Sequence, residues 1–426
     1  MKRLFINIGI LVQVETGDSV LKRAGEEMSV MNLIKDSYMA VENEVISDFG
    51  SMETLRALTS NGVEYWLENM ADEVVDLKGA VVMPSFCDSH THLVYAGSRE
   101  REFIDKVRGL SYKEIAARGG GILNSAQLLH ETDENELFRQ TEVRAREILS
   151  YGTGAVEIKS GYGLNPEDEI KMLRVAKRIE KETPLTVKTT FLGAHAVPSR
   201  YLGKREEYVN EIINEMIPVI ATEELADYVD VFTEDGFFTV EDTDRILNAG
   251  MKYGLRAKVH ANQMSFSGGV QVGVKYNAIS VDHLEFTGVE EFNLLKKSDT
   301  MATLLPGSTF FLEMEYAPAR RMIESGIAVA LATNYNPGSS PYGDMRFIMA
   351  LAALKYKMTT EEIINAVTIN GAYAMGLSES HGSIARGKRA DFIVCKDIPS
   401  LDYIPYTFTS PLIDQIWLGG VKISVS

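Results

Sequence analysis

Short apolar runs recur along the middle of the chain and alternate with longer segments of mixed character. Runs of this length are typical of strands in a sheet that is buried on both faces. The longer segments between them have the spacing of helices. The apolar runs cover residues 81–87, 155–158, 187–192, 228–232, 256–260, 278–283, 301–305 and 328–333.

Several of the longer segments carry residues that begin or end helices. Asn165 followed by Pro166 predicts a helix start, because asparagine caps a helix and proline suits its first position. Thr239 with Asp242 three residues later predicts another start, and Gly254 predicts its end. Behind the first start lies an apolar face with helical spacing, formed by Met172, Val175, Ala176 and Ile179.

Eight strands that alternate with helices predict an α/β fold, a distorted (β/α)8 barrel of the TIM type. A doubly wound parallel sheet is the structural alternative, because it has the same alternation. When that fold binds a dinucleotide it carries Gly-x-Gly-x-x-Gly after the first strand, and the sequence lacks this motif there. We therefore expect the barrel, over residues 81–378.

Both ends of the chain have a different pattern, in which β-like runs are separated by polar turns. We expect residues 1–80 and 379–426 to join as one small composite β-sandwich domain built from both chain ends. The runs cover residues 4–14, 38–46 and 74–82, with a turn at 48–50, and then 391–395, 415–418 and 421–425.

Charge and cysteine content exclude several classes of function. Acidic residues outnumber basic ones by 60 to 43, and the net charge is −17. This charge opposes binding to nucleic acid or to an anionic membrane, and an anionic substrate would need a local cation.

Two cysteines make no disulfide framework, which favours a reducing, cytoplasmic location. Asn7 and Gln13 interrupt the apolar N-terminal run, so we interpret it as a strand rather than a signal peptide. No apolar run has membrane-spanning length.

Five of the seven histidines fall at the ends of predicted strands. His90 and His92 are two residues apart, so in an extended chain they point to the same side. Because the carboxyl ends of barrel strands meet at one rim, these histidines should lie together. Imidazoles in such a group predict a metal site. The other three are His195, His260 and His283, while His130 and His381 lack partners in the pattern and are expected at the surface.

Some of these residues also have a purely structural interpretation. His195 could pack in the core, and His283 could form a local ion pair with Asp282. Arg99 lies in a charged run and could be solvated. Residues 119–121 are three glycines, but no Gly-Lys-Ser/Thr follows, so a flexible loop over the barrel mouth is favoured over a phosphate loop.

Several longer motifs resemble those of the amidohydrolase superfamily and, within it, the imidazolonepropionase family. The superfamily motifs are DSHTH at residues 88–92 and GSIARGKRAD at 382–391. The narrower family is indicated by HLVYAGSR at 92–99, VEIKSGYGL at 156–164, FLGAHAVP at 191–198 and NPGS at 336–339.

This resemblance implies a metal-dependent hydrolase that opens the cyclic amide of 4-imidazolone-5-propanoate to N-formimidoyl-L-glutamate in histidine degradation. It implies one Zn2+ or Fe3+ ion per chain and usually a homodimer. His283 would be the base that accepts a proton from the attacking water. The implied metal ligands are His90, His92, His260 and the residue at position 334.

The resemblance also implies a binding site for a small anionic heterocycle. Arg99 would hold the propanoate carboxylate, for which the guanidinium fork is suited. Tyr162 and His195 would contact the substrate, and Gln263 would bond a ring nitrogen. The product side of the pocket would be lined by Asn336, Gly338 and Ser339.

Asn334 departs from the family pattern, which has aspartate at this position. An asparagine carbonyl coordinates a metal weakly and accepts no proton near neutral pH, so metal binding should weaken and His283 would be the sole base. Asp344, ten residues later, could replace the carboxylate. Two rival hypotheses follow: a catalytically silenced homologue that still binds the ligand, and another cyclic amidohydrolase or deaminase of nitrogen heterocycles.

Overall fold

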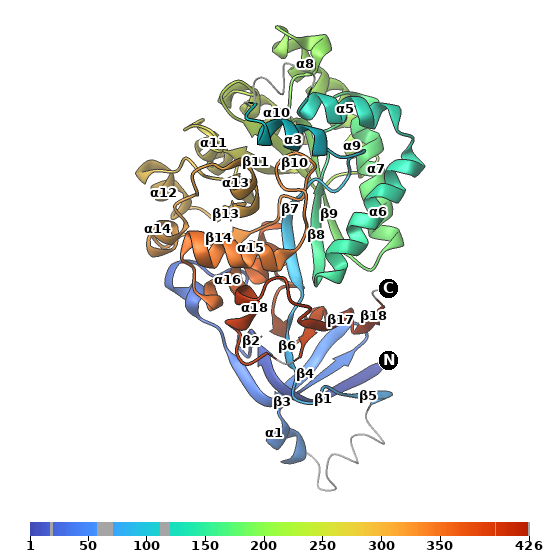
Figure 1. Ribbon diagram of the computed structural model, residues 1–426, viewed down its shortest axis with the longest axis vertical. Coiled ribbons are helices and arrows are strands. Elements are labelled where there is room, and N and C mark those ends of the chain that lie inside the picture. The colour runs from blue at the N-terminus through green and yellow to red at the C-terminus, as the bar shows by residue number, and fades with distance from the viewer. Residues whose placement is uncertain (18–19, 58–70, 111–119, 397, 425–426) are drawn as a thin grey trace.

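The computed structural model describes residues 1–17, 20–57, 71–110, 120–396 and 398–424, and it has two parts (Figure 1). A parallel barrel fills the upper part of the view, and strands from both chain ends form a sheet below it. The barrel strands are hydrogen-bonded in chain order, which confirms the barrel and excludes the doubly wound sheet. They are β7 Phe86–Thr91, β8 Thr153–Lys159, β9 Thr186–Ala194, β10 Tyr228–Thr233, β11 Arg256–Ala261, β12 Ser280–His283, β13 Met301–Leu304 and β14 Val329–Leu331.

The barrel closes where the last strand returns to the first. An isolated parallel bridge joins Thr91 to Tyr335. The amide of His92 donates to the carbonyl of Tyr335 at 2.9 Å, and the amide of Asn334 donates to the carbonyl of His90 at 3.0 Å. This closure brings Asn334 beside the first histidine pair, although more than 240 residues separate them.

Helices cover the outside of the barrel, and the predicted helix starts are confirmed. The Asn165 side chain accepts from the amide of Asp168 at 2.9 Å, and Thr239 forms a reciprocal capping box with Asp242. The helices are α3 Glu100–Val107, α5 Ile122–Glu131, α6 Glu134–Ser150, α7 Pro166–Glu182, α8 Arg205–Glu211, α9 Ile217–Thr222, α10 Val240–Lys252, α11 Gly269–Lys275, α12 Val289–Leu295, α13 Pro306–Leu312, α14 Ala319–Glu324, α15 Met345–Leu351, α16 Thr360–Val367 and α17 Ile369–Ala374. Short 3-10 or π turns lie at Gly25–Ser29, Ser199–Tyr201, Ile212–Met216 and Ala352–Tyr356.

The composite β domain from both chain ends is confirmed. β6 lies at its centre, parallel to β1 and antiparallel to β16, so the two ends of the chain share one sheet. Phe5, Phe392 and Trp417 pack together in its core, with ring centroids 4.8 to 5.9 Å apart. The strands are β1 Lys2–Val12, β3 Leu33–Glu42, β4 Val45–Ser51, β5 Glu73–Asp76, β6 Val81–Pro84, β16 Phe392–Cys395, β17 Ile413–Leu418 and β18 Val421–Ile423, with β2 Val14–Glu15 paired to β15 Ile384–Ala385 beside them.

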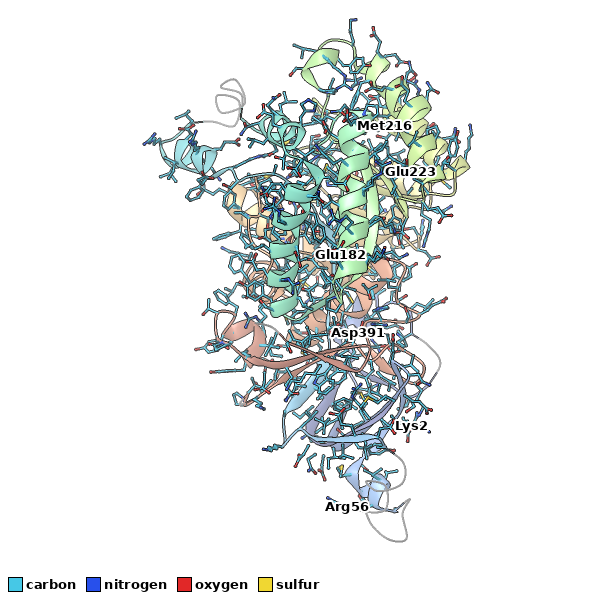
Figure 2. All side chains as sticks on the ribbon, turned by 90° about the vertical axis from the view of Figure 1, so that its right-hand side faces the viewer. Lys2, Arg56, Glu182, Met216, Glu223 and Asp391 are labelled. Carbon is cyan, nitrogen blue, oxygen red and sulfur yellow. The ribbon has the colours of Figure 1, made fainter. Side chains whose placement is uncertain are left out.

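Figure 2 shows the same two layers from the side, with Glu182 at the end of a barrel helix above Asp391 and Lys2 in the sheet region. Two further helices, α1 Met52–Ala57 and α18 Tyr403–Tyr406, belong to the terminal segments. Within the described ranges, no helix combines the length and apolar character needed to cross a membrane. The domain boundaries at residues 80/81 and 378/379 stay a prediction.

Several details of the strand prediction are wrong. The runs predicted at residues 38–46 and 74–82 each extend over two strands, β3 with β4 and β5 with β6. The run at residues 81–87 is two strands, because β6 ends at Pro84 in the terminal sheet and β7 begins at Phe86 in the barrel. Continuous apolar character cannot separate two buried strands in succession. His90 therefore lies within β7 rather than beyond it.

The turn predicted at residues 48–50 is also wrong, because these residues belong to β4. The chain reverses instead at Asn43 and Glu44, whose φ values of 49° and 75° are those of a tight hairpin turn. Gly50 serves a different purpose. It faces Tyr38 across the strand pair, and a Cβ at this position would lie 3.1 Å from the tyrosine ring.

Candidate metal and substrate site

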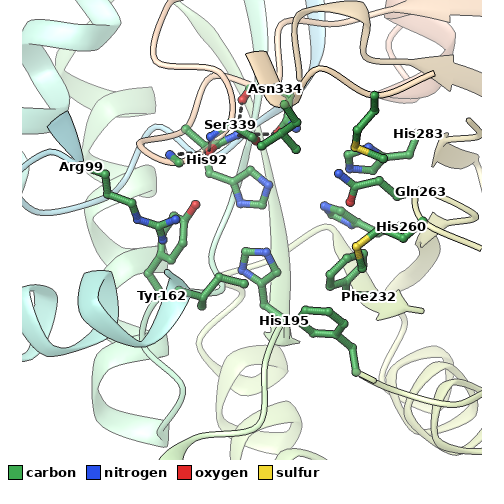
Figure 3. Close-up of a pocket in the computed structure, with 17 residues that line it drawn as sticks. His92, Arg99, Tyr162, His195, Phe232, His260, Gln263, His283, Asn334 and Ser339 are labelled. Carbon is green, nitrogen blue, oxygen red and sulfur yellow. Dashed lines mark hydrogen bonds between the residues drawn. The ribbon is translucent and has the colours of Figure 1, made fainter. Parts of the chain in front are cut away.

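A cavity of about 340 Å³ opens at the carboxyl ends of the barrel strands (Figure 3). Arg99 and Tyr162 lie on one side of it and His260 and Gln263 on the other, with His195 between them. The structure brings every predicted site residue except His90 into the lining of this cavity, and His90 is buried directly behind it. The remaining predicted residues in the lining are His92, His283, Asn334, Asn336, Gly338 and Ser339.

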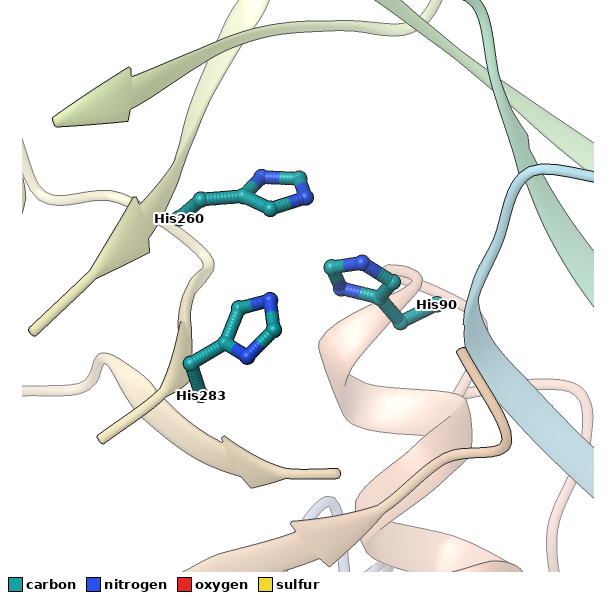
Figure 4. A group of neighbouring side chains, drawn as sticks. All are labelled: His90, His260 and His283. Atoms are coloured by element: carbon teal, nitrogen blue, oxygen red, sulfur yellow. The ribbon is translucent and has the colours of Figure 1, made fainter. Parts of the chain in front are cut away.

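Three histidines from three strands converge at the closed end of the cavity. His90, His260 and His283 each offer a ring nitrogen, and these atoms lie within 4.8 Å of one another (Figure 4). His92 is adjacent, with ring centroids 5.4 Å from His90 and 5.6 Å from His260. Four imidazoles thus surround one small space. The assignment of His92 as a ligand and of His283 as the base stays a prediction.

Buried carboxylates fix the orientation of two of these rings. Asp282 Oδ2 lies 2.6 Å from His90 Nδ1, and Asp230 Oδ2 lies 2.9 Å from His260 Nδ1. A carboxylate behind a ligand histidine holds the ring in place and makes its other nitrogen a better donor. Asp230 was not predicted, and Asp282 was considered only as an ion-pair partner of His283, whereas it pairs with His90.

Beneath the histidines, a fully buried ammonium holds these carboxylates together. Lys159 Nζ lies 2.7 Å from Glu157, 2.9 Å from Asp230 and 3.6 Å from Asp282. Burial alone would lower the pKa of Lys159, but the three carboxylates outweigh it and raise this pKa. Burial would raise the pKa of Asp230, but His260 and Lys159 outweigh burial and hold this pKa well below its usual range. The barrel interior below the cavity is therefore an ionic layer.

Several buried ring nitrogens at this end of the cavity fit a metal ion. In the part of the chain that the structure describes, His90 Nε2, His92 Nδ1 and His260 Nε2 are buried and lack hydrogen-bond partners. Burial lowers the pKa values of these three rings, with help from Lys159, and at His260 it outweighs the opposing effect of Asp230, so the rings are neutral. A neutral imidazole is the form that ligates metals. Buried lone pairs of this kind are costly when they have no partner, and a metal ion would satisfy them.

At the other side of the cavity, Arg99 presents a guanidinium group. Its Nε donates to Ser125 Oγ at 2.9 Å, whereas its Nη2 is buried and has no partner among the described residues. The guanidinium carbon lies 5.6 Å from the centre of the Tyr162 ring. Gly338 allows this placement, because a Cβ there would lie 2.2 Å from Arg99 Nη1. The arrangement suits a carboxylate.

Asn336 organises the loop that carries Gly338 and Ser339. Its Oδ1 accepts from the amides of both residues at 2.8 Å, and its Nδ2 donates to Ser339 Oγ at 2.8 Å. Asn336 thus fixes the shape of this wall of the cavity, as asparagine does in many turns.

His195 stacks on His92, with ring centroids 5.2 Å apart and an interplanar angle of 11°. Its Nδ1 lies 2.9 Å from the carbonyl of Gly161. Because a carbonyl only accepts, Nδ1 carries the hydrogen and Nε2 is left as an acceptor. Burial lowers the pKa of His195 to about 3, so the ring is neutral.

Asn334 lies at the point of barrel closure with a φ of 53°. Asparagine is among the residues that best tolerate this left-handed conformation. Its Oδ1 accepts from Asn336 Nδ2 at 3.1 Å. Asp344 does not replace a carboxylate here, because it caps α15 and forms an ion pair with Arg346 at 2.6 Å. No carboxylate belongs to the cavity lining among the residues described, so the proton acceptors that line it are histidines.

The two remaining histidines test the surface prediction. His130 is exposed, as predicted, and its Nδ1 lies 2.8 Å from Asp168. The prediction for His381 is wrong, because this residue is buried between Thr186 and Ser380. A lone histidine in a polar stretch gives no sign of the tertiary contact that buries it. The glycine loop at 119–121 lies partly outside the described residues.

The comparisons with known proteins agree with this geometry. The profile of the Amidohydrolase family matches residues 81–421. An imidazolonepropionase from Flavobacterium johnsoniae is 51% identical over 420 residues, which cover 99% of each chain. The chain belongs to the imidazolonepropionase family of amidohydrolases. A more distant member, from Bacillus cereus, is 38% identical over 98% of this chain and 95% of its own.

Solved structures of other amidohydrolases share the fold. A zinc-bound adenosine deaminase from Xanthomonas campestris has a TM-score of 0.72 at 15% identity, over 99% of this chain and 92% of its own. A triazine hydrolase variant has a TM-score of 0.73 at 14% identity, over 99% and 94%. At this identity the likeness shows the fold alone. Membership in the imidazolonepropionase family and the histidine cluster together indicate a metal cofactor.

Proposed function

We propose that this protein hydrolyses 4-imidazolone-5-propanoate to N-formimidoyl-L-glutamate in histidine degradation. One observation carries the proposal: a cavity that has a buried histidine cluster at one side and, at the other, a guanidinium whose Nη2 has no partner among the described residues. The first fits a metal-dependent attack on a ring amide, and the second fits the carboxylate of a short side chain. We further propose that the enzyme is a cytoplasmic homodimer.

In this proposal Arg99 holds the propanoate and thereby sets the position of the ring. Tyr162 packs beside the guanidinium, and the free Nε2 of His195 accepts from a ring N–H. Gln263 lies across the cavity and bonds the opposite ring nitrogen. Asn336 with the loop of Gly338 and Ser339 shapes the product side of the pocket.

His90, His92 and His260 would hold one Zn2+ or Fe3+ ion, with the amide oxygen of Asn334 as a weak further ligand. When bound, such an ion polarises the ring carbonyl and lowers the pKa of water. His283 accepts the proton of the attacking water and returns it to the ring nitrogen as the C–N bond breaks. The ring carbonyl carbon becomes the new carboxylate, and the nitrogen stays in the formimidoyl group.

The test compares the protein with its Asn334→Asp variant on imidazolonepropanoate, with bound metal measured in both. Turnover by the unaltered chain supports the proposal and assigns the base to His283. Turnover by the Asp variant alone means that Asn334 has silenced the enzyme and left a binding protein. If neither variant turns over, a panel of other cyclic amides and amino-substituted heterocycles separates a different amidohydrolase or deaminase.

A further inference from the structure

Glu285 lies buried behind His283. Its Oε2 is 3.8 Å from His283 Nδ1, and the two side chains are 1% and 3% exposed. Within the described residues, neither of these two buried atoms has a hydrogen-bond partner. Glu285 is absent from the cavity lining, so it faces the ring from the protein interior. A carboxylate oxygen and a ring nitrogen thus face each other slightly beyond hydrogen-bond distance.

The backbone that places these two side chains is unusual. His283 has a φ of 90° and Leu284 a φ of 69°, values that non-glycine residues rarely adopt because they are strained. Backbone bonds hold the conformation, because the amide of Leu284 donates to Ala261 at 3.1 Å and that of Phe286 to Asn262 at 2.9 Å. Strain of this kind persists where the surrounding structure enforces it, and it is found mostly at functional sites.

The other oxygen of Glu285 is already occupied. The Thr309 hydroxyl, on α13, donates to Glu285 Oε1 at 2.7 Å. Thr309 is itself fully buried. The carboxylate is therefore held from one side and leaves Oε2 for His283. Asp282 and Asp230 occupy the same side of His90 and His260, at 2.6 and 2.9 Å from Nδ1, so Glu285 takes the corresponding place behind a third ring at the longer distance of 3.8 Å.

We propose that Glu285 is a positioning residue that accepts the Nδ1–H of His283 and fixes the tautomer of this ring. A carboxylate only accepts, so Nδ1 must carry the hydrogen and Nε2 keeps a lone pair towards the cavity. That lone pair is what a base requires, so the inference rests on the proposed role of His283 in hydrolysis. Glu285 also places a carboxylate beside His283 while this ring carries the proton.

The variant Glu285→Gln tests this with a change of nearly the same shape. The Thr309 hydroxyl lies 2.7 Å from the side chain at position 285 and 3.3 Å from its other acceptor, the Leu305 carbonyl, so it donates to the nearer group and selects the carbonyl oxygen of Gln at position 285. The amide NH2 then faces His283 and donates to Nδ1, which forces the hydrogen onto Nε2. This is the wrong tautomer for a base, and the comparable change in a serine protease triad lowers kcat about 10⁴-fold. We expect kcat to fall at least about 100-fold, with KM changed less than about threefold.

The tautomer itself is the second readout, and it does not need activity. Protein labelled with ¹⁵N at histidine and loaded with zinc gives ring nitrogen resonances, and His283→Asn assigns those of His283. We expect a protonated Nδ1 in the unaltered protein and an unprotonated Nδ1 in Glu285→Gln. This measurement stays decisive if imidazolonepropanoate is not the substrate, so failure of the proposed function and failure of this inference are distinguishable.

A rescue and a control complete the experiment. Thr309→Val removes the donor that orients the amide, so in the Glu285→Gln background it lets the carbonyl turn to His283 and should restore part of kcat and the original tautomer. The matched control is Glu291→Gln, since Glu291 is a buried glutamate that caps α12 at Gly288, outside the cavity lining. It should leave both readouts unchanged.

Three results would overturn the proposal. One is an unchanged His283 tautomer in Glu285→Gln. Another is a kcat for Glu285→Gln that equals that of the Glu291→Gln control. The third is a loss of bound zinc in Glu285→Gln, which would make His283 a metal ligand rather than a base.

Discussion

Replacement of Arg99 by alanine should separate recognition of the substrate carboxylate from chemistry at the ring. The structure shows one guanidinium nitrogen bonded to Ser125 and Nη2 buried without a partner among the described residues. A carboxylate can therefore accept two charge-assisted hydrogen bonds, each of about 1.5–3 kcal/mol. We take their combined loss as about 3–4 kcal/mol, which lowers kcat/KM about 100- to 1,000-fold.

The assay compares two substrates under steady-state conditions. One is imidazolonepropanoate, and the other is the corresponding 5-ethyl imidazolone, which has the ring but no carboxylate. Arg99→Ala should lower kcat/KM strongly for the first, mostly through KM, and by less than about threefold for the second. Arg99→Lys should give an intermediate loss, because it keeps the charge but not the planar fork.

An equal loss on both substrates would refute the reasoning. It would mean that the variant disturbs the cavity as a whole, for example through Tyr162 or Ser125. An unchanged KM for imidazolonepropanoate would show that the carboxylate binds elsewhere.

Other substitutions test the walls of the site and its support. Gly338→Ala should raise KM about 10-fold or more in the same assay, because its Cβ would displace Arg99, and an unaltered KM would contradict this. Asp230→Asn should weaken metal affinity about 10- to 100-fold, because it removes the negative charge behind His260. The affinity is measured in competition with a chelator, and the same affinity in the variant and the unaltered protein would show that this charge is dispensable. Asp168→Asn should lower the free energy of unfolding by about 2 kcal/mol at pH 7. Burial raises the pKa of Asp168, but the groups that donate hydrogen bonds to its carboxylate outweigh burial and lower this pKa. The stability difference between the two proteins, measured by urea titration, should therefore disappear as the pH falls below about 3.8. A difference that stays constant with pH would show that the charge of Asp168 is not its cause.

The histidine rim could be predicted because it depends on few steps of inference. Strand ends are visible as the ends of apolar runs, and a closed parallel barrel brings those ends together wherever they lie in the chain. His195 and His260 are placed by this rule alone. The same rule placed Asn334 near His90, although the hydrogen bonds that close the barrel there could not be read from sequence.

The ionic layer beneath the rim could not be predicted for a physical reason. Glu157, Lys159 and Asp230 are charged residues, which ordinarily indicate the solvent side of a strand. They are buried because alternate residues of a closed barrel face its interior, and their charges compensate one another there. The strained backbone at His283 could not be predicted from the sequence either, because no residue type near His283 indicates a positive φ.

The shared terminal sheet has a consequence for the order in which the protein can fold during synthesis. β6 leaves the ribosome early, but its antiparallel partner β16 begins at Phe392, more than 300 residues later. Until then, one edge of the N-terminal strands stays open and Phe5 lacks its contacts with Phe392 and Trp417. Open edges invite pairing with other chains. A chain truncated before Phe392 would keep this edge exposed, so we expect it to aggregate more readily than the chain that carries β16.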